Sequence, residues 1–169
     1  MKTLRLVLGD QLSRDLPSLE DLDPAKDLVL MAEVMSEVTY VKHHKRKIAY
    51  LFSAMRHFAN SLGDDGIAVR YCRLDDPDNA GSLADEVANA IAAFGPDRIV
   101  ITAPGEYRLA DEMAGWHARF GLVVDIRADT RFLCSLDDFA EWAEGRKSLR
   151  MEFFYRDLRR RYKVLMEGN

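Results

Sequence analysis

The chain has 169 residues, of which 48% are hydrophobic and 31% charged, and its formal net charge is −4. This composition favours one well-buried domain. No apolar run is long enough to span a bilayer, and residues 1–12 lack the apolar stretch and cleavage site of a signal peptide, so we expect a cytoplasmic location. Cys72 and Cys134 belong to no CxxC pair, which argues against a disulfide framework and against a zinc or iron–sulfur site in these residues.

Five apolar runs alternate with helical patterns along the chain. The predicted strands are residues 4–8, 28–32, 67–72, 99–102 and 122–126, and the predicted helices are roughly residues 44–62, 83–94 and 107–120. Gly63, Gly95 or Gly121 follows each helix and can adopt the left-handed conformation that ends a helix. The alternation predicts an α/β fold, a Rossmann-like, doubly wound sheet of five parallel strands in the order 3-2-1-4-5 with helices on both faces.

Ligands of such sheets bind beyond the carboxyl ends of the strands, where the strand order reverses. The reversal lies between the first and fourth strands, so residues 9–12 should meet residues 103–107, with residues 33–37 alongside. Three polar loops are thus expected to converge on one crevice.

The helix predicted from residue 44 begins with an unusual run of cations. Lys45, Arg46 and Lys47 oppose the helix dipole, which favours acidic groups in the first turn. An anionic or polyhydroxylated ligand at the free backbone donors would offset that cost, and a solvated basic patch is the alternative. On the same helix, Arg56 and Asn60 are expected to face water.

Several common motifs are missing from the sequence. It has no GxGxxG, GxxxxGK[ST] or GxSxG motif, so dinucleotide binding, P-loop chemistry and serine hydrolysis are disfavoured, and we nominate no catalytic residue. A phospho-acceptor receiver is also disfavoured, because its carboxylate should end the third strand, where Tyr71 and Cys72 stand.

No metal site is expected either. The adjacent His43 and His44 side chains diverge, and the acidic residues 75–78 lack the spacing of a calcium loop. Residues 75–78 are better explained as a solvated turn before Ser82, the predicted N-cap of the next helix.

The last part of the chain differs from the rest. A short helix is predicted at residues 136–143, and residues 146–169 hold eight Lys or Arg against three Asp or Glu, a local charge of +5 against −9 for the remainder. An apolar stripe there is too aromatic to face water: Met151, Phe154, Tyr155, Leu158, Tyr162 and Leu165. We therefore expect an α/β domain at residues 1–135 and, at residues 136–169, the beginning of a basic helical linker.

Several segments in order carry a family resemblance: LVLGDQLS, EVMSEVTYVKHHKRKIAYLFSAMRHFA, VRYCRLDDPDNAGS, ITAPGEYR and GRKSLRMEFFYRDLRRRYKVLM. Together they resemble the bacterial photolyase-related proteins, the iron–sulfur branch of the cryptochrome and photolyase family that includes prokaryotic (6-4) photolyases. The resemblance covers essentially the whole chain. It concerns only the N-terminal antenna domain of that family.

The resemblance implies that this domain binds 6,7-dimethyl-8-ribityllumazine as a light-harvesting chromophore. It places FAD, a [4Fe-4S] cluster and the DNA lesion site in a separate C-terminal helical domain, so the expected partners are that domain and, through the full-length protein, DNA, with no membrane involved. The antenna residues it implies are Gly9, Asp10, Gln11, Leu12, Val34, Glu37, Tyr40, Lys47 and Leu51.

The function expected from this resemblance is light harvesting for light-driven repair of DNA photoproducts, with no lyase activity in this chain alone. A blue-light photoreceptor without repair activity is one alternative. The others are a stand-alone nucleotide-binding or regulatory α/β module and an interaction fragment whose basic helix docks a partner.

Overall fold

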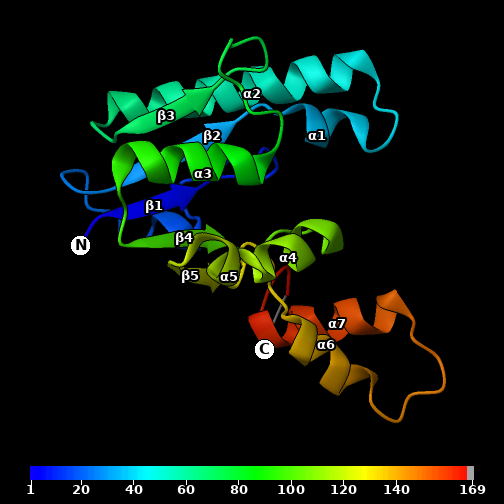
Figure 1. The fold of residues 1–169 in the computed structure, drawn as a ribbon. Helices are drawn as coiled ribbons and strands as arrows, with labels where there is room; N and C mark the ends of the chain where they lie inside the picture. The colour runs from blue at the N-terminus through cyan, green and yellow to red at the C-terminus, as the bar shows by residue number, and fades with distance from the viewer. Residues whose placement is uncertain (167–169) are drawn as a thin grey trace. The chain divides into compact units, whose positions relative to one another are not determined.

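The computed structural model describes residues 1–166 and divides into two compact units, Met1–Asp129 and a second unit that starts at Thr130 (Figure 1). The first unit contains the sheet and the second contains two helices. No helix in the described residues is long and apolar enough to cross a membrane.

The first unit is built on five parallel strands. They are β1 (Thr3–Leu6), β2 (Leu28–Ala32), β3 (Val69–Cys72), β4 (Arg98–Thr102) and β5 (Val123–Arg127), in the order β3-β2-β1-β4-β5. In the central strand β1, Leu4 pairs with Leu28 of β2 on one side and with Ile99 of β4 on the other. The predicted fold class and strand order are confirmed.

Helices cover both faces of the sheet. One face packs against α3 (Leu83–Phe94), α4 (Tyr107–Ala114) and α5 (Trp116–Phe120). The other packs against α2 (Lys45–Asp64) and the segment around the short helix η1 (Pro17–Leu19), while α1 (Met35–Thr39) follows β2. The side chains of β1 alternate between the two faces, as the pleat of a strand requires.

Two of the three predicted helix stops are confirmed. Gly95 and Gly121 take the left-handed conformation, with φ of 62° and 66°. The prediction for Gly63 is wrong, because α2 continues to Asp64 and Gly66, with φ of 80°, adopts that conformation instead. Residues 63–66 read GDDG, so two glycines are available near the end of the helix, and the second one takes the left-handed conformation.

The helix predicted over residues 107–120 is divided in the structure. It consists of α4 and α5, separated at Gly115, whose N–H bonds to the Glu112 carbonyl 3.1 Å away, an i→i−3 bond. Glycine weakens a helix interior, which explains why the break occurs there.

A buried arginine fixes the connection between β1 and β2. Arg5 is fully buried in β1, and its guanidinium donates to Asp27 Oδ2 at 2.8 Å and to the Ser18 carbonyl at 2.6 Å. It also donates to Asp21 Oδ1, and hydrogen bonds from Arg127 and Arg5 hold the pKa of Asp21 well below its usual value. The apolar pattern of residues 4–8 gave no sign of this ionic cluster.

The second unit is a pair of helices, α6 (Leu136–Ala143), as predicted, and α7 (Met151–Tyr162). Phe154 lies between Phe139 and Trp142, with ring centroids 5.1 and 4.9 Å away. The Trp142 indole N–H donates to Asp157 at 2.9 Å, and Arg161 pairs with Asp138 at 2.6 Å.

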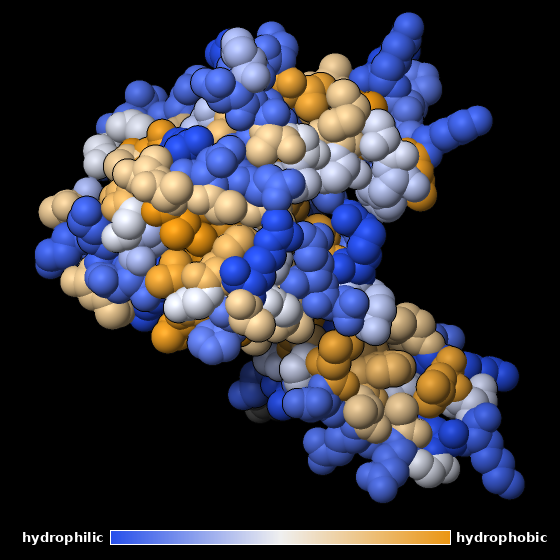
Figure 2. All heavy atoms as spheres, viewed as in Figure 1, coloured by the Kyte–Doolittle hydropathy of each residue, from blue (hydrophilic) through white to orange (hydrophobic). Residues whose placement is uncertain are grey.

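Most of the apolar stripe predicted in this unit is exposed. Phe154 is buried, but Met151, Tyr155 and Tyr162 are exposed, and Leu165 lies beyond the end of α7. Figure 2 shows several hydrophobic side chains together on the viewed face of this unit. That the stripe packs on a further domain stays a prediction.

Candidate functional site

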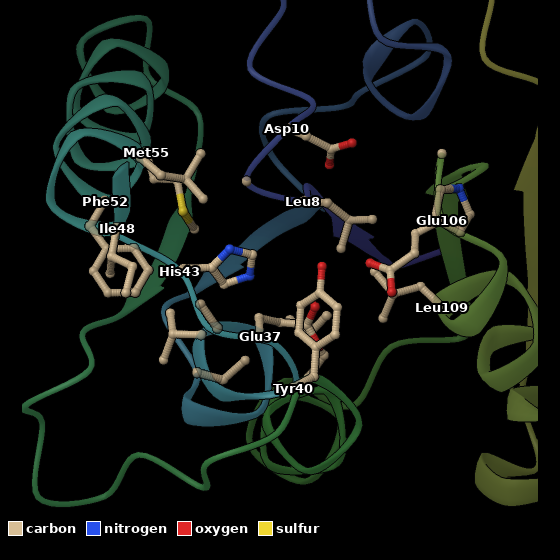
Figure 3. Close-up of a pocket in the computed structure, with 18 of the residues that line it drawn as sticks. Leu8, Asp10, Glu37, Tyr40, His43, Ile48, Phe52, Met55, Glu106 and Leu109 are labelled. Atoms are coloured by element: carbon tan, nitrogen blue, oxygen red, sulfur yellow. The ribbon is translucent and has the colours of Figure 1, made fainter. Parts of the chain in front are cut away.

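A cavity of about 330 Å³ lies at the carboxyl ends of the central strands of the first unit. The chain after β1, β2 and β4 contributes to it, together with α2 (Figure 3). This is the point at which the strand order reverses, because β1 is flanked by β2 and β4. The residues that line it are Val7, Leu8, Gly9, Asp10, Ala32, Val34, Glu37, Val38, Tyr40, His43, Lys47, Ile48, Leu51, Phe52, Met55, Leu83, Pro104, Gly105, Glu106 and Leu109.

Most of the site residues expected from the sequence line this cavity. They are Gly9, Asp10, Val34, Glu37, Tyr40, Lys47 and Leu51. The structure places the other two, Gln11 and Leu12, outside the lining. Gln11 is fully buried, and its side-chain amide donates to the carbonyls of Thr102 and Ala103, at 3.1 Å each. It ties the loop after β1 to the loop after β4, whereas Leu12 packs in the core beneath α2.

One wall of the cavity is an apolar stripe of α2. Ile48, Leu51, Phe52 and Met55 recur at helical spacing and all line the cavity. Figure 3 shows Ile48, Phe52 and Met55 on the same side of it. The helical spacing of this stripe is typical of packing on a sheet, and Leu51, Phe52 and Met55 do pack against the core on this face while also lining the cavity.

Gly9 keeps this wall close to the end of β1. A Cβ atom at position 9 would lie 3.0 Å from Met55 Sδ and 3.5 Å from Leu51 Cδ2. Even a Cβ atom there requires the Met55 side chain to shift by a few tenths of an ångström, and a larger side chain needs more space from the α2 wall or the cavity. Glycine at this position therefore preserves the volume of the cavity.

The side of the cavity opposite the α2 stripe is polar, and Arg108 of α4 holds its acidic side chains in place. Its guanidinium donates to Glu37 Oε2 at 2.6 Å and to Glu106 Oε1 at 2.9 Å, and lies 4.5 Å from the centre of the Tyr40 ring. The hydrogen bond to Glu37 is the main reason that the pKa of Arg108 is raised. Sequence reasoning missed Arg108, whose only signal was its place two residues after Glu106 at the start of a helix.

Acidic and aromatic side chains surround the rest of the opening. Asp10 and Glu106 lie on the side away from the α2 stripe, and the Tyr40 hydroxyl points inward between them and His43 (Figure 3). The Tyr40 and His43 rings meet edge to face with centroids 5.3 Å apart. The site thus combines a flat apolar wall with carboxylates on the opposite side.

The beginning of α2 differs from the open anion site considered above. The helix begins at Lys45, one residue after the predicted start, and His44 is its N-cap, whose Nδ1 accepts from the Arg46 N–H at 3.2 Å. The His44 carbonyl accepts from the N–H groups of Lys47 and Ile48, at 2.9 and 3.3 Å. These three donors are therefore occupied within the helix itself.

Glu33 directly follows β2 and is a second carboxylate near the cavity, outside its lining. Glu33 is fully buried and accepts hydrogen bonds from Arg56 Nε at 2.6 Å, the Tyr71 hydroxyl at 2.6 Å and the Leu74 N–H at 3.0 Å. Burial raises the pKa of Glu33, but these donors outweigh it and leave the pKa below its usual value. Asn60 is exposed, as predicted. The Arg56 side chain is also 41% exposed, but its guanidinium is not simply solvated, because it fixes α2 to Glu33 at the end of β2.

Comparison with known proteins identifies the family. Residues 5–169 match the family described as "Deoxyribodipyrimidine photo-lyase-related protein". The chain belongs to this family. It is also 53% identical over 168 residues to a protein of Agrobacterium fabrum named "(6-4) photolyase", a match that covers 99% of this chain and 33% of that protein. This photolyase-related chain therefore spans about a third of the length of the relative it matches.

Cys72 of this photolyase-related chain lies in surroundings that disfavour the reactive thiolate. Cys72 is buried and donates to Glu86 Oε2 at 3.1 Å, and burial, assisted by that carboxylate, raises the pKa of the thiol to about 11. Within residues 1–166, no group of three or more His, Cys, Asp or Glu side chains is placed to hold a metal ion.

Proposed function

We propose that the first unit is the light-harvesting domain of a photolyase-like flavoprotein and that its cavity binds 6,7-dimethyl-8-ribityllumazine. The observation that carries this proposal is the cavity itself, with an apolar wall facing carboxylates where the strand order reverses. Its volume of about 330 Å³ falls within the range of about 300–1,000 Å³ common for small-molecule sites. Membership of the photolyase-related family supports the choice of ligand class.

The lining residues suit the two chemically different parts of such a ligand. Leu51 and Phe52 offer an apolar surface on which a fused ring packs. Glu37 and Asp10 offer carboxylate oxygens that accept hydrogen bonds from ring N–H groups or ribityl hydroxyls. Lys47 and Tyr40, which are partly exposed, complete the lining at the opening.

The chromophore, when bound, would absorb light and transfer the excitation energy to a flavin. The protein's part is to hold the ring in one orientation, and the close approach of α2 at Gly9 with the Arg108 ion pairs serves that purpose. We further propose that the whole protein carries FAD and a [4Fe-4S] cluster in a C-terminal helical domain that acts on DNA photoproducts. The relative named "(6-4) photolyase" supports this, and the exposed stripe of α7 would contact that domain.

The test is a fluorescence anisotropy titration of the purified chain with the lumazine. We expect binding in the micromolar range or tighter for the unmodified chain. Gly9→Leu should weaken binding by about a hundredfold or more, because the new side chain enters the space between β1 and Met55. A folded, unmodified chain that binds no lumazine at tens of micromolar would contradict the proposal.

Gly63→Leu is the matched control for that substitution. It is also a glycine-to-leucine substitution, but it lies on α2, at a position where an added Cβ has no atom within 4 Å. It should leave lumazine affinity unchanged, and circular dichroism should show both variants folded. Calorimetry with AMP and ATP completes the test, since nucleotide binding in the absence of lumazine binding would favour the nucleotide-binding alternative.

A further inference from the structure

We infer that Arg108 is a positioning residue of the cavity. It lies outside the lining, holds residues 35–50 against the cavity from α4, and thereby slows the dissociation of a bound ligand. This inference rests on the proposed function and deepens it, because it names what keeps the ligand in place. It is carried by the burial of residues 35–50 and by the contacts that join them to α4.

Residues 35–50 line the cavity without being anchored in the core. They comprise α1, a turn and the beginning of α2; the structure describes all of them, and none is buried. None belongs to either group of core side chains, although the segment supplies six residues of the lining, including Glu37 and Tyr40. Further along α2, Met55 and Leu62 are buried against the sheet. A segment with so few buried contacts opens at a lower cost in free energy than the core does.

Contacts from other elements hold this segment in place. The Ser36 N–H donates to the Gly81 carbonyl at 3.0 Å. Arg108 Nη2 donates to Glu37 Oε2 at 2.6 Å, and the guanidinium lies 4.5 Å from the centre of the Tyr40 ring. Glu37 and Tyr40 both line the cavity, and Figure 3 shows them beside each other. One arginine therefore holds two lining residues of the segment at once.

Arg108 itself is fixed on a firmly packed element. α4 buries Leu109 and Met113 in the core. Glu106, which precedes α4, accepts a hydrogen bond from Arg108 Nε at 2.9 Å, while Nη2 bonds to Glu37. The two bonds leave from different nitrogens of one planar group, and charged hydrogen bonds of this kind fix geometry as well as adding strength. The guanidinium is thus directed from α4 toward α1.

Loss of the Arg108 contacts should act on the exit of a ligand more than on its entry. A ligand bound between the apolar wall of α2 and Glu37 leaves when residues 35–50 move away from the cavity. Contacts that favour the closed position lower the population of the open one, so they slow dissociation. Association begins from the open position, and removing these contacts does not make that position rarer.

The experiment measures association and dissociation of the lumazine by stopped-flow fluorescence on the whole chain. Arg108→Gln should raise the dissociation rate by about threefold to tenfold, a modest effect because the ion pair is partly exposed. The association rate should stay within about twofold of the unmodified value. Arg108→Lys keeps the charge but not the two hydrogen bonds from one plane, so its dissociation rate should be intermediate.

Hydrogen exchange tests the segment in the absence of any ligand. In Arg108→Gln the amides of residues 35–50 should exchange at least about threefold faster, while those of α3 should be unchanged. Faster exchange throughout the first unit would show that Arg108 acts on the fold as a whole and would overturn the inference.

Arg119→Gln is the matched control. Arg119, on α5, pairs with Asp85 at 2.6 Å, its side chain is 46% exposed, and neither residue lines the cavity. The substitution also removes an arginine from an exposed ion pair, so both lumazine rates and the exchange of residues 35–50 should be unchanged.

The outcomes distinguish this inference from the proposed function. If the unmodified chain binds no lumazine, the proposed function fails and the inference fails with it. If lumazine binds but Arg108→Gln leaves its dissociation rate unchanged, or slows association as much as it speeds dissociation, the inference fails and the proposed function stands. If Arg108→Gln does not fold, Arg108→Lys decides the result, and a dissociation rate equal to that of the unmodified chain overturns the inference.

Discussion

Glu33 and Glu37 lie four residues apart after the same strand, and each pairs with an arginine, yet their surroundings differ. The Glu33 side chain is 0% exposed and receives donors from α2, β3 and the chain after β3. The Glu37 side chain is 26% exposed, lines the cavity and is bound by Arg108 on one oxygen at 2.6 Å. A buried carboxylate whose donors are all in place maintains the fold, whereas one that faces a cavity retains capacity for a ligand.

Glu33→Ala should have the largest effect on stability. It leaves the Tyr71 hydroxyl and the Leu74 N–H without their acceptor, and it leaves Arg56 without its carboxylate. We expect a loss of about 3 kcal/mol in the free energy of unfolding, the lower end for a broken buried ion pair, because the Arg56 side chain is 41% exposed. Urea denaturation measures this loss. Asp111→Ala, at an exposed position, should change it by less than about 0.5 kcal/mol.

Glu37→Gln should show the opposite pattern, with an effect on binding rather than on stability. Replacing a charged acceptor by an amide should weaken lumazine binding by about tenfold or more, because hydrogen bonds to charged groups contribute about 1.5–3 kcal/mol. The free energy of unfolding should fall by less than about 1 kcal/mol, since the Glu37–Arg108 pair is partly exposed. If Glu37→Gln destabilises the chain as much as Glu33→Ala does, the distinction between the two carboxylates is wrong.

The sequence was sufficient to predict the fold and the position of the cavity, but not the surroundings of these two carboxylates. Alternating strands and helices determine a parallel sheet, and the reversal of strand order determines where a cavity forms. The burial of Glu33 depends on Arg56, Tyr71 and Leu74, which are distant in the sequence. Arg108 likewise meets Glu37 across 71 positions, so no local pattern reveals their pairing.

Arg56→Lys should weaken the Glu33 cluster without abolishing it. Arginine makes two hydrogen bonds to the carboxylate, from Nε at 2.6 Å and Nη2 at 2.8 Å, and a lysine ammonium cannot reproduce this planar pair. We expect a loss of about 1–2 kcal/mol in the free energy of unfolding, less than for Glu33→Ala. Lumazine affinity should change little if Glu33 acts on the fold alone. An affinity loss as large as that of Glu37→Gln would show that the cluster shapes the cavity wall directly.

The pH dependence of stability gives the smallest and most specific comparison. Burial opposes ionisation of Glu33, but its donors lower its pKa in the folded chain below the unfolded value of about 4.3. The folded chain therefore binds a proton at Glu33 less readily than the unfolded chain, so this group stabilises the fold above about pH 4.3 and loses that contribution as the pH falls through the folded pKa. The free energy difference between the unmodified chain and Glu33→Gln should accordingly shrink from pH 5 to pH 3 in urea titrations. A difference that stays constant over this range would mean that Glu33 stabilises the fold by its shape and hydrogen bonds and not by its charge.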